Sequence, residues 1–599
     1  MKKFFQFYPS FLSFLQAYYM YQIHITSSMG NLPINTRTIG VYLLSILSMY
    51  VGSFIILNIV HRPVARVISS IIFLLLFNLQ ISYHFASNQL FDWSFFIDNI
   101  DILFYRDSAY TIIHSLDLPT LIYGPVLCLI LLLVDIKKKV IRSQPKDIHK
   151  RHIVYAMVIY SLIIWMPVRS YDPSVSLFRS IIFYYNSPVL NSTIIAKKNN
   201  NDFFPSKNTP SMSGKKPHVF LILVESFNAN YFNIVDKDQQ PVTPFLNQLK
   251  KEALSVEYFY GNSVQTAKGM AAALFSTYPS FSGKLFVKFK GLTLDSPFDV
   301  LKPHGYLSLF YLGHSKLKYD NREGFLIRHN IDLTTTVYDV IDNTDRDLST
   351  MWGIRDDRLI KHFFNYFDQT TSTYKDKSIF SVILTSQSHV PFILPKHMRK
   401  AFPNANTIQE NYANCLQNID LGIKRFFKEL DERGLRDNSI VIITADHAFP
   451  MGEHGITSLE AGIYEESYRI PFLLVAPGLS KKELKGPFSQ VDIMPTVFDL
   501  LNITKKNSMF IGRSIFSKKA SNVSVQIQPY EKQISIVKLP LKYRYSVKNN
   551  KEYVVNLLDD PLEENNIINS VEESELDEFR ERVRDVYATQ KYYEQHKKK

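Results

Sequence analysis

Two segments of the chain carry acidic and imidazole side chains just after short runs of apolar, β-branched residues. Glu225 follows the run His218–Val224, and the pair Asp446-His447 follows the run Ile440–Thr444. Carboxylate and imidazole groups together suit zinc or manganese. An Asp-His pair at the end of a strand is more often a cap or an ion pair, so each segment alone indicates little. Together they predict a metal site, provided that the fold brings both segments to one place.

A threonine between these two segments is a candidate nucleophile. Thr266 precedes the small-residue stretch Gly269–Phe275, whose composition predicts a helix. Helix N-termini present free N–H groups and a positive dipole end, which suits a phosphoryl group. A free hydroxyl is a poor nucleophile, but metal coordination lowers its pKa and makes attack on phosphorus feasible. The competing interpretation is an ordinary N-cap, which the residue in isolation favours.

The elements that must position these residues alternate after the first third of the chain. Further short apolar runs and helical patterns follow one another at Pro244–Ala253, Leu307–Leu312, Ile379–Leu384, Asn411–Arg433 and Pro471–Val475. This alternation predicts an α/β domain with a parallel sheet and helices on both faces. Ligands of such sheets bind at the carboxyl ends of the strands. The candidate metal ligands are therefore expected at one edge of the sheet.

The first third of the chain holds long apolar runs without charges. A membrane-spanning helix needs about 20 predominantly apolar residues, and five runs approach that length: Phe4–Ile23, Val41–Val60, Val67–Phe85, Leu118–Val134 and Ile153–Val168. The alternative for the first run is a cleaved signal peptide, although it lacks the small-residue cleavage site of such peptides. The sequence therefore predicts a multi-span α-helical membrane domain.

The basic residues of the short loops predict the orientation of these spans. Lysine and arginine gather before the first span, at Arg62 and Arg66, and between Lys137 and Arg151, whereas the intervening loops are poor in them. Basic loops stay in the cytoplasm. We therefore expect everything after Val168 to lie outside the cytoplasmic (inner) membrane of a bacterium.

Composition and segment boundaries complete the predicted organisation. Val175–Asn186 predicts an amphipathic helix at the membrane surface, and Ala196–Pro217 predicts a linker whose lysines are accessible to proteases. We expect a membrane domain at 1–168, the amphipathic helix and linker at 169–217, a catalytic domain at 218–515, and a subdomain with a basic tail at 516–599.

The bulk composition excludes several classes of protein. The net charge of +13 is explained by membrane topology, and we find no nucleic-acid-binding module. Only two cysteines are present, Cys128 and Cys415, which excludes a cysteine-rich metal site.

Three motifs resemble those of the sulfatase and alkaline phosphatase superfamily: VESF at 224–227, QTAKG at 265–269 and TADHAFPMGEHG at 444–455. The branch that the chain resembles is the membrane-bound lipoteichoic acid synthases and related phosphoglycerol transferases. The resemblance implies that Glu225, Thr266, Asp446 and His447 bind one divalent metal, Mn²⁺ or Zn²⁺, and that Thr266 is the covalent nucleophile. It also implies an alkaline phosphatase-like domain followed by a small carboxy-terminal α+β subdomain.

Further segments fit the same resemblance. Gly313-His314 with Asn321-Arg322 resembles the segment that binds substrate phosphate, with a spacing one residue shorter, and Ser388–Phe392 resembles the histidine turn near the leaving group. The segments 468–472, 490–496 and 559–565 resemble later blocks. The resemblance thus implies that His314, Arg322 and His389 contact substrate, with His389 also a possible proton donor.

The sequence allows two interpretations for each of two further side chains within the motifs. His454 is either a further metal or substrate ligand or a solvated loop histidine. Lys268 is either a neutralising charge for phosphate or a surface lysine.

The residues around the nucleophile narrow the reaction. True sulfatases carry Cys or Ser in a Cys/Ser-x-Pro-x-Arg motif, whereas here Thr266 is followed by Ala-Lys-Gly. A two-metal phosphatase needs a second ligand set, for which Asp356, His389 and His454 are only partial candidates. A one-metal threonine enzyme beside a bilayer indicates a phospholipid donor and ping-pong transfer.

Several donors and acceptors remain open. The donor is phosphatidylglycerol, with phosphoglycerol passing to a cell-envelope glycan or polymer, or phosphatidylethanolamine, with its headgroup passing to lipid A or a surface sugar. The Glu-Ser opening and the scarcity of cysteines favour phosphatidylglycerol, because the resemblance implies that enzymes of the phosphoethanolamine branch usually carry disulfides. A phosphodiesterase that uses water is a third possibility. A non-enzymatic scaffold is disfavoured because all four ligand positions are filled.

Overall fold

The computed structural model describes residues 43–52, 55, 93–98, 150–165, 173–185, 201–206, 209, 216–314, 317–341, 353–459, 461–517 and 523–596. The chain divides into two compact units. One comprises Met1–Ser187 with His454–Ser458, and the other comprises Pro188–Glu453 with Leu459–Lys599. Almost all of the predicted catalytic domain thus falls in the second unit.

The described part of residues 1–187 is helical. Besides a helical segment at 43–52, it contains α4 (Trp93–Asp98), α7 (Lys150–Trp165) and α8 (Pro173–Tyr185). The side chain of Arg179 on α8 donates hydrogen bonds to the carbonyls of Ile163 and Ile164 at the end of α7, at 2.5 and 2.7 Å. α8 (Pro173–Tyr185) thus confirms that a helix is present near the predicted Val175–Asn186.

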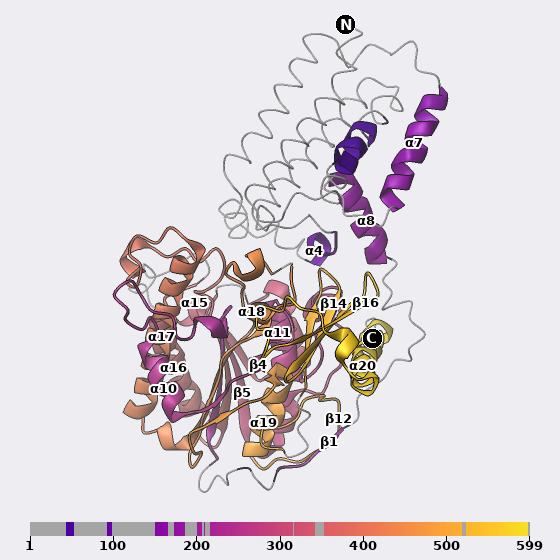
Figure 1. The fold of residues 1–599 in the computed structure, drawn as a ribbon. Helices are drawn as coiled ribbons and strands as arrows, with labels where there is room; N and C mark the ends of the chain where they lie inside the picture. The colour runs from indigo at the N-terminus through magenta and orange to yellow at the C-terminus, as the bar shows by residue number, and fades with distance from the viewer. Residues whose placement is uncertain are drawn as a thin grey trace. The chain divides into compact units, whose positions relative to one another are not determined.

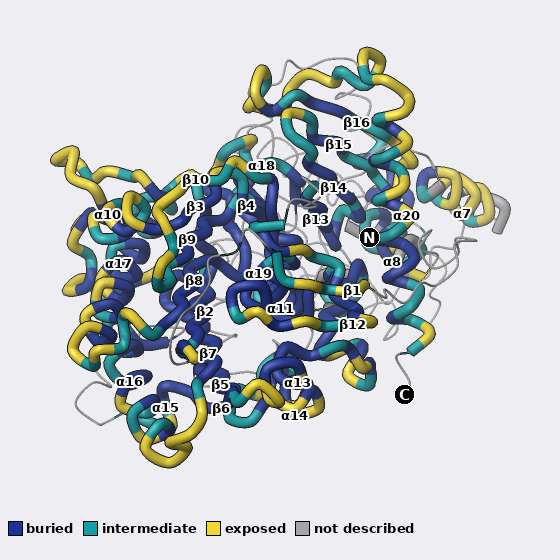
Figure 2. The backbone as a smooth tube through the Cα atoms, turned by 90° about the horizontal axis from the view of Figure 1, so that it is seen from below, coloured by how far each residue is buried: buried dark blue, intermediate teal, exposed yellow. Residues whose placement is uncertain are grey.

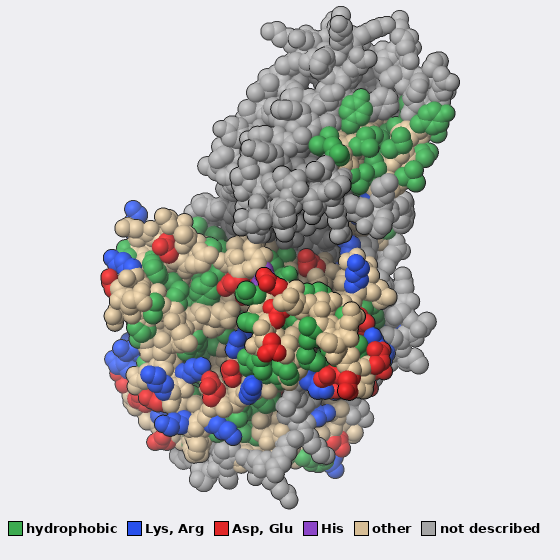
Figure 3. All heavy atoms as spheres, viewed as in Figure 1, with side chains coloured by type: hydrophobic (Ala, Val, Ile, Leu, Met, Phe, Trp, Pro, Cys, Tyr) green, Lys and Arg blue, Asp and Glu red, His purple; other side chains and the backbone are tan. Residues whose placement is uncertain are grey.

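The predicted membrane spans are only partly covered by the described residues. Within those residues, no helix has both the length and the apolar character required to cross a bilayer. The runs Phe4–Ile23, Val67–Phe85 and Leu118–Val134 lie outside the described residues, and the other two overlap the helices at 43–52 and α7. The exposed side chains of α7 are nevertheless mostly apolar: Val154, Tyr155, Met157, Val158, Ile159 and Leu162. Figure 3 shows hydrophobic side chains gathered in this region of the surface.

The second unit is built on an eight-stranded sheet with helices on both faces (Figure 1). In spatial order the strands are β10 (Lys482–Leu484), β3 (Leu254–Val256), β9 (Phe472–Val475), β8 (Ser439–Ala445), β2 (His218–Val224), β7 (Ser378–Leu384), β5 (Tyr306–Leu312) and β6 (Leu333–Thr336). The central strands β8, β2, β7 and β5 are parallel and almost wholly buried (Figure 2). Such continuous apolar runs are typical of a strand covered on both faces.

One strand departs from the predicted all-parallel sheet. β9 runs antiparallel to both of its neighbours, β8 and β3. The chain leaves β8 at the carboxyl edge and reaches β9 through loops and the short helix α18 (Glu465–Tyr468), without a helical crossover. Because a parallel connection requires such a crossover, β9 must run back in the opposite direction.

Two sets of helices sandwich the sheet. α10 (Pro244–Glu252), α16 (Asp356–Thr373) and α17 (Ile408–Glu432) cover one face, while α11 (Thr266–Phe275), α13 (Pro297–Leu301), α14 (Arg322–Arg328) and α19 (Ile493–Leu500) lie on the other (Figures 1 and 2). Aromatic side chains fill the first interface: Phe220 of β2 meets Phe426 of α17 edge-on, with ring centroids 5.2 Å apart. α17 begins earlier than the apolar pattern predicted, because Thr407 and Glu410 form a capping box.

Shorter elements connect these layers. They are η3 (Ala229–Tyr231), β4 (Phe259–Tyr260), α12 (Leu285–Lys288), η4 (Lys302–His304), η5 (Tyr319–Asn321), α15 (Val337–Val340), η7 (Lys396–Met398), η8 (Arg436–Asn438), η9 (Glu453–Gly455), β11 (Phe488–Ser489), η10 (Gln490–Asp492) and η11 (Ile568–Ser570). β4 and β11 pair in parallel as a separate two-stranded sheet.

Part of the predicted linker is a strand. β1 (Asn201–Phe203) pairs antiparallel with β12 (Lys505–Ser508), which follows it by about 300 residues in the chain. Just beyond β1, Ser206 donates its backbone N–H to Asp499 Oδ1 at 2.7 Å and its hydroxyl to the carbonyl of Phe516 at 3.0 Å. The segment 201–206 is therefore part of the catalytic unit rather than a free tether.

The carboxy-terminal residues form a second antiparallel sheet. β13 (Ser524–Gln528), β14 (Gln533–Lys538), β15 (Leu541–Ser546) and β16 (Lys551–Asn556) follow one another as a meander, and α20 (Glu573–His596) packs its apolar side chains on them. This is the α+β arrangement expected after residue 515. This sheet and helix do not form a compact unit of their own. They belong to the same unit as the main sheet, which comprises Pro188–Glu453 and Leu459–Lys599.

Candidate active site

The candidate residues follow the carboxyl ends of four neighbouring strands. Asp446 and His447 follow β8, Glu225 follows β2, His389 lies in the turn after β7, and His314 comes two residues after β5. These strands are adjacent and parallel, in the order β8, β2, β7, β5. The sheet therefore brings residues that are far apart in the sequence to one edge, as expected for this type of fold.

Hydroxyl groups from neighbouring elements hold Glu225 in place. Its backbone N–H donates to Thr385 Oγ1 at 3.0 Å, and its carbonyl accepts from Ser388 Oγ at 2.5 Å. The next residue, Ser226, has a left-handed backbone (φ 56°) and donates its hydroxyl to Glu225 Oε1 at 2.8 Å. Tyr412 of α17 in turn donates to the Ser226 carbonyl at 2.8 Å. The backbone of Glu225 and one oxygen of its carboxylate are thus fixed.

The two carboxylate oxygens of Asp446 have different environments. Oδ1 accepts the backbone N–H groups of Ser226 and His447, at 2.9 and 2.7 Å. Oδ2 is buried and accepts no hydrogen bond from the described residues. Behind the strand end, Gln490 Nε2 donates to the carbonyls of Ala445 and Asp446, at 2.9 and 2.6 Å. A buried carboxylate oxygen without a donor is rare and calls for a ligand.

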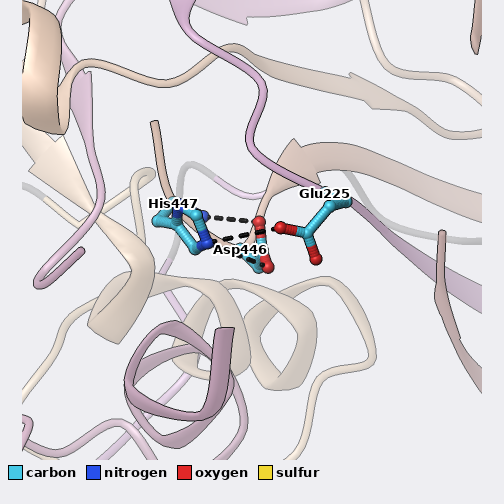
Figure 4. A group of neighbouring side chains, drawn as sticks. All are labelled: Glu225, Asp446 and His447. Atoms are coloured by element: carbon cyan, nitrogen blue, oxygen red, sulfur yellow. Dashed lines mark hydrogen bonds and ion pairs between the residues drawn. The ribbon is translucent and has the colours of Figure 1, made fainter. Parts of the chain in front are cut away.

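His447 directs one ring nitrogen at both carboxylates (Figure 4). Its Nδ1 lies 2.8 Å from the carbonyl oxygen of Ala448, which can only accept, so Nδ1 carries a hydrogen. Nε2 lies 3.4 Å from Glu225 Oε1 and 3.6 Å from Asp446 Oδ2. A backbone carbonyl that binds the second ring nitrogen is the usual support of a metal-binding histidine.

The three ionisable side chains perturb one another. Burial favours the neutral carboxyl of Glu225, but the hydrogen bond and charge of His447 outweigh it and lower the pKa of Glu225. Burial, reinforced by the charge of Glu225, raises the pKa of Asp446. Burial disfavours the imidazolium of His447, yet the two carboxylates raise the pKa of His447 above its ordinary value. A buried cation is therefore strongly favoured between the carboxylates.

This donor set fits a divalent metal. Glu225, Asp446 and His447 each offer one ligand atom, and these atoms lie within 4.8 Å of one another. All three side chains are buried, and Asp446 Oδ2 has no other partner among the described residues. Two carboxylates and a neutral imidazole are a common set for zinc and manganese.

Thr266 lies beside the ligand cluster and is not the cap of its helix. It is the first residue of α11, whose N-cap is Gln265. Its hydroxyl donates to Glu225 Oε2 at 3.4 Å, beside the cluster of ligands. The N-cap interpretation of Thr266 is therefore wrong.

A glycine allows α11 to approach this closely. A Cβ atom on Gly269 would lie 1.7 Å from the carbonyl oxygen of Asp446. No side chain fits there, so Gly269 is required for the helix to pack on the end of β8.

Lys268 is not on the surface. Its side chain is fully buried, and Nζ donates to the carbonyls of Ser280 and Gly283, each at 2.7 Å. The surface-lysine interpretation is thus wrong, and these bonds tie the loop after α11 to the helix that carries Thr266.

His389 and Arg322 lie near the cluster. Nδ1 of His389 lies 2.7 Å from the carbonyl of Val390, so Nδ1 carries a hydrogen. Burial lowers the pKa of His389; the charge of Glu225 opposes this, and those of His447 and Arg322 add to it. Arg322 begins α14, is buried, and has an Nε without a hydrogen-bond partner among the described residues. His314 is also buried.

The remaining candidates do not join the ligand group. His454 lies in η9 with a left-handed backbone (φ 50°), in the segment that divides with residues 1–187. Asp356 begins α16 and is buried. Among the described residues, the acidic and imidazole groups close enough to share a metal are Glu225, Asp446 and His447.

Three supporting residues were not predicted. Thr385 directly follows β7, so its position at a strand end, the signal that marks Glu225 and Asp446, could have identified it. Gln490 lies in a block singled out only by resemblance. Tyr412 gives no signal, because a buried tyrosine in a helix looks like core.

Comparisons with known proteins agree with this architecture. Residues 217–503 match the family model described as Sulfatase. The chain is 26% identical over 350 residues to the lipoteichoic acid synthase-like YvgJ of Bacillus subtilis (54% of each chain). It is 26% identical over 366 residues to a lipoteichoic acid synthase of Staphylococcus aureus, covering 56% of this chain and 53% of that one. The match thus spans about half the length of these curated relatives.

Solved structures share the fold. The crystal structure of the lipoteichoic acid synthase LtaP from Listeria monocytogenes aligns with a TM-score of 0.55 at 20% identity, over 69% of this chain and 98% of that one. A protein of the alkaline phosphatase superfamily from Vibrio parahaemolyticus aligns equally well, with a TM-score of 0.55 over 68% and 94%. The α/β domain therefore has the alkaline phosphatase-like fold.

Proposed function

We propose that this chain, an enzyme with a sulfatase-family catalytic domain, transfers the phosphoglycerol headgroup of phosphatidylglycerol to a cell-envelope glycan or polymer through a phospho-threonine at Thr266. The observation that carries the proposal is the position of the Thr266 hydroxyl, 3.4 Å from Glu225 Oε2 at the N-terminus of α11. The similarity to lipoteichoic acid synthases supports the choice of donor.

The metal would be held by Glu225, Asp446, His447 and Thr266, and Mn²⁺ or Zn²⁺ suits these donors. When bound, a divalent metal lowers the pKa of a coordinated hydroxyl and stabilises negative charge on a phosphoryl group.

The chain's own residues would then carry two successive displacements. Thr266 Oγ1, as the alkoxide that a lowered pKa favours, attacks phosphorus, and the bond from phosphorus to the diacylglycerol oxygen breaks. In the second half, an acceptor hydroxyl attacks the phospho-threonine and Thr266 leaves as the same alkoxide, so its protonation is unchanged over the cycle. The free N–H groups of the first turn of α11 stabilise the phosphoryl oxygens throughout.

His389 would move the proton in both halves. Its Nδ1 hydrogen is directed at Val390, so the protonated ring, which the charge of Glu225 favours, gives its Nε2 proton to the departing diacylglycerol oxygen. The neutral ring that remains then accepts the proton of the incoming acceptor hydroxyl. Arg322 and His314 would bind the headgroup phosphate, and Arg322 has a buried Nε suited to it.

The proposal includes a place for the enzyme. Membrane spans within residues 1–168 would hold the catalytic unit outside the cytoplasmic membrane, where lipid donor and diacylglycerol product partition into the same bilayer. The exposed apolar side chains of α7 support a lipid environment for that helix.

The test measures donor turnover by full-length protein in detergent with Mn²⁺ or Zn²⁺. Fluorescent phosphatidylglycerol and fluorescent phosphatidylethanolamine are supplied separately, with Thr266→Ala as the control. We expect metal-dependent release of fluorescent diacylglycerol from phosphatidylglycerol alone, and none from Thr266→Ala.

Other outcomes would redirect the assignment. Turnover of phosphatidylethanolamine alone would make the chain a phosphoethanolamine transferase. Release of free glycerol phosphate with a glycan acceptor present would indicate a phosphodiesterase. Absence of turnover with either lipid would refute headgroup transfer.

A further inference from the structure

A buried ion pair lies next to Arg322. Lys284 Nζ is 2.8 Å from Asp320 Oδ1, and the two side chains are only 4% and 5% exposed. Charged side chains are rarely buried so completely unless they are paired. The structure therefore contains a fixed carboxylate two residues before the arginine proposed to bind phosphate.

Arg322 lies farther than Lys284 from the same carboxylate. Its guanidinium lies 3.8 Å from Asp320 Oδ2, beyond a normal hydrogen bond, and its Nε has no hydrogen-bond partner among the described residues. Lys284 and Arg322 thus share one carboxylate, with the lysine much closer. Within the described part of the chain, the charge of Arg322 is therefore incompletely neutralised at a buried position, which favours an anionic ligand.

The backbone fixes this arrangement. Asp320 and Asn321 both have left-handed conformations (φ 54°), which are unusual for residues other than glycine. Asn321 Nδ2 donates to the carbonyl of Phe286 at 2.7 Å, so the turn is held from a second side. α14 begins directly after this turn, with Arg322 as its first residue.

The same loop connects this turn to the nucleophile. Gly283, next to Lys284, accepts a hydrogen bond from Lys268 of α11 through its carbonyl, at 2.7 Å. Two buried lysines in succession therefore link the helix of Thr266 to the turn of Arg322.

We propose that Lys284 is a positioning residue: by occupying Asp320 it keeps Arg322 available for a phosphate oxygen of the substrate. Without the lysine, Asp320 would be an unpaired buried carboxylate whose nearest cation is Arg322, and it would draw the guanidinium into a close pair. The role assigned to Arg322 rests on the proposed function, but the competition for Asp320 is a property of the structure.

The test titrates inorganic phosphate into full-length protein with saturating Mn²⁺ by isothermal calorimetry. Lys284→Met keeps an apolar stem and removes the charge, so we expect phosphate to bind about tenfold more weakly. Lys284→Met combined with Asp320→Asn removes the competing carboxylate, and we expect affinity to return to within about threefold of wild type. Lys302→Met is the matched control, because Lys302 pairs with Asp332 at an exposed site, and we expect no change.

Several results would refute the positioning role of Lys284. A folded Lys284→Met variant with wild-type affinity, a double variant as weak as the single one, or no phosphate binding by the wild type would overturn the proposal. If Lys284→Met does not fold, Asp320→Asn alone decides: we expect unchanged or tighter binding, and a tenfold loss would refute the competition.

The kinetic consequence separates this inference from the proposed function. With phosphatidylglycerol, Lys284→Met should raise KM more than it lowers kcat, and Lys284→Arg should restore most of the loss. Failure of lipid turnover in the wild type would refute headgroup transfer and leave the phosphate affinities standing. Normal turnover with unchanged affinities in Lys284→Met would refute only the positioning role.

Discussion

At the scale of single residues, Asp446 divides its two carboxylate oxygens between structure and chemistry. Oδ1 accepts two backbone N–H groups and fixes the turn, while Oδ2 accepts no hydrogen bond from the described residues. An oxygen so fixed loses little freedom on binding a cation, which is the advantage of a preformed site.

The first prediction follows from that division. In Asp446→Asn the amide can still accept both backbone bonds, but the negative charge is lost. We expect the affinity for Mn²⁺ to fall at least about tenfold while the fold is retained. Calorimetric titration of the full-length protein with Mn²⁺ measures this. Glu483→Gln, which alters an exposed ion pair with Lys250, serves as the control, and equal affinities for Asp446→Asn and wild type would contradict the assignment.

The second prediction concerns pH. Burial lowers the pKa of His218 to about 4, and its Nδ1 accepts the backbone N–H of Ile379 at 3.0 Å, which requires a neutral ring. In the unfolded chain the ring takes up a proton near pH 6.5, whereas in the folded protein it does so only near pH 4. The folded state therefore loses stability as pH falls from about 6.5 towards 4.

We expect this histidine to contribute a loss of about 2 kcal/mol between pH 7 and pH 5. His218→Gln removes the titrating group, so its free energy of unfolding should fall by about that much less over the same range. Urea unfolding at the two pH values measures both slopes. Parallel slopes for variant and wild type would show that His218 is not held neutral.

The sequence was sufficient to predict the charged site residues. It was not sufficient to predict the hydroxyl side chains that hold them in place through hydrogen bonds. Glu225 and the Asp446-His447 pair stand out because charged groups directly follow apolar strands. Thr385 and Ser388 fix Glu225 through hydrogen bonds that depend on the order of β2 and β7 in the sheet. Strand order is a tertiary property that short-range periodicity does not contain.

At the scale of elements, α10 begins without a cap of its own. The Thr243 hydroxyl at its N-cap position donates instead to the carbonyl of Phe232 at 2.7 Å. Asp420 of α17 supplies the missing acceptors: Oδ1 takes the N–H of Leu246 at 2.7 Å and Oδ2 that of Phe245 at 3.2 Å. A residue from another helix therefore caps α10 and fixes the contact between the two helices.

The third prediction tests this cap. Asp420→Ala leaves two backbone N–H groups of α10 without an acceptor, so we expect a loss of about 1–2 kcal/mol in the free energy of unfolding. Asp431→Ala on the same helix removes only an exposed ion pair with Arg436, and the free energy of unfolding should change by no more than about 0.5 kcal/mol. Urea denaturation compares the two. Similar losses would mean that the cap adds no stability.

Elements are predictable where the pattern is local and less so where tertiary pairing decides. The strands β2, β5, β7 and β8 match the predicted runs to within one residue at each end, because each is a continuous apolar run. The direction of β9 differs from the prediction, because an apolar run does not show whether the strand will be parallel or antiparallel to its neighbours. The sequence predicts a linker for the segment of β1 because polar residues predominate there. It forms a strand only through its pairing with β12, which the local sequence does not show.

At the scale of the whole molecule, the predicted topology is testable without a structure. The fourth prediction concerns an enzymatic reporter that is active only outside the cytoplasm. Fused after residue 215 it should be active, and fused after Lys146 it should be inactive, because lysine and arginine hold that loop inside. The reverse pattern of activity would overturn the orientation, and activity at both positions would change the number of spans.

The strand β1 changes what a proteolytic cut in the linker would do. Lys207 lies just after the segment 201–206, whose backbone and side chains bond to β12, Asp499 and Phe516. Cleavage there would give two fragments on a denaturing gel, yet under native conditions they would sediment together as a non-covalent complex. Release of the catalytic unit would then require the segment 201–206 to separate from β12, Asp499 and Phe516 in addition to the cut.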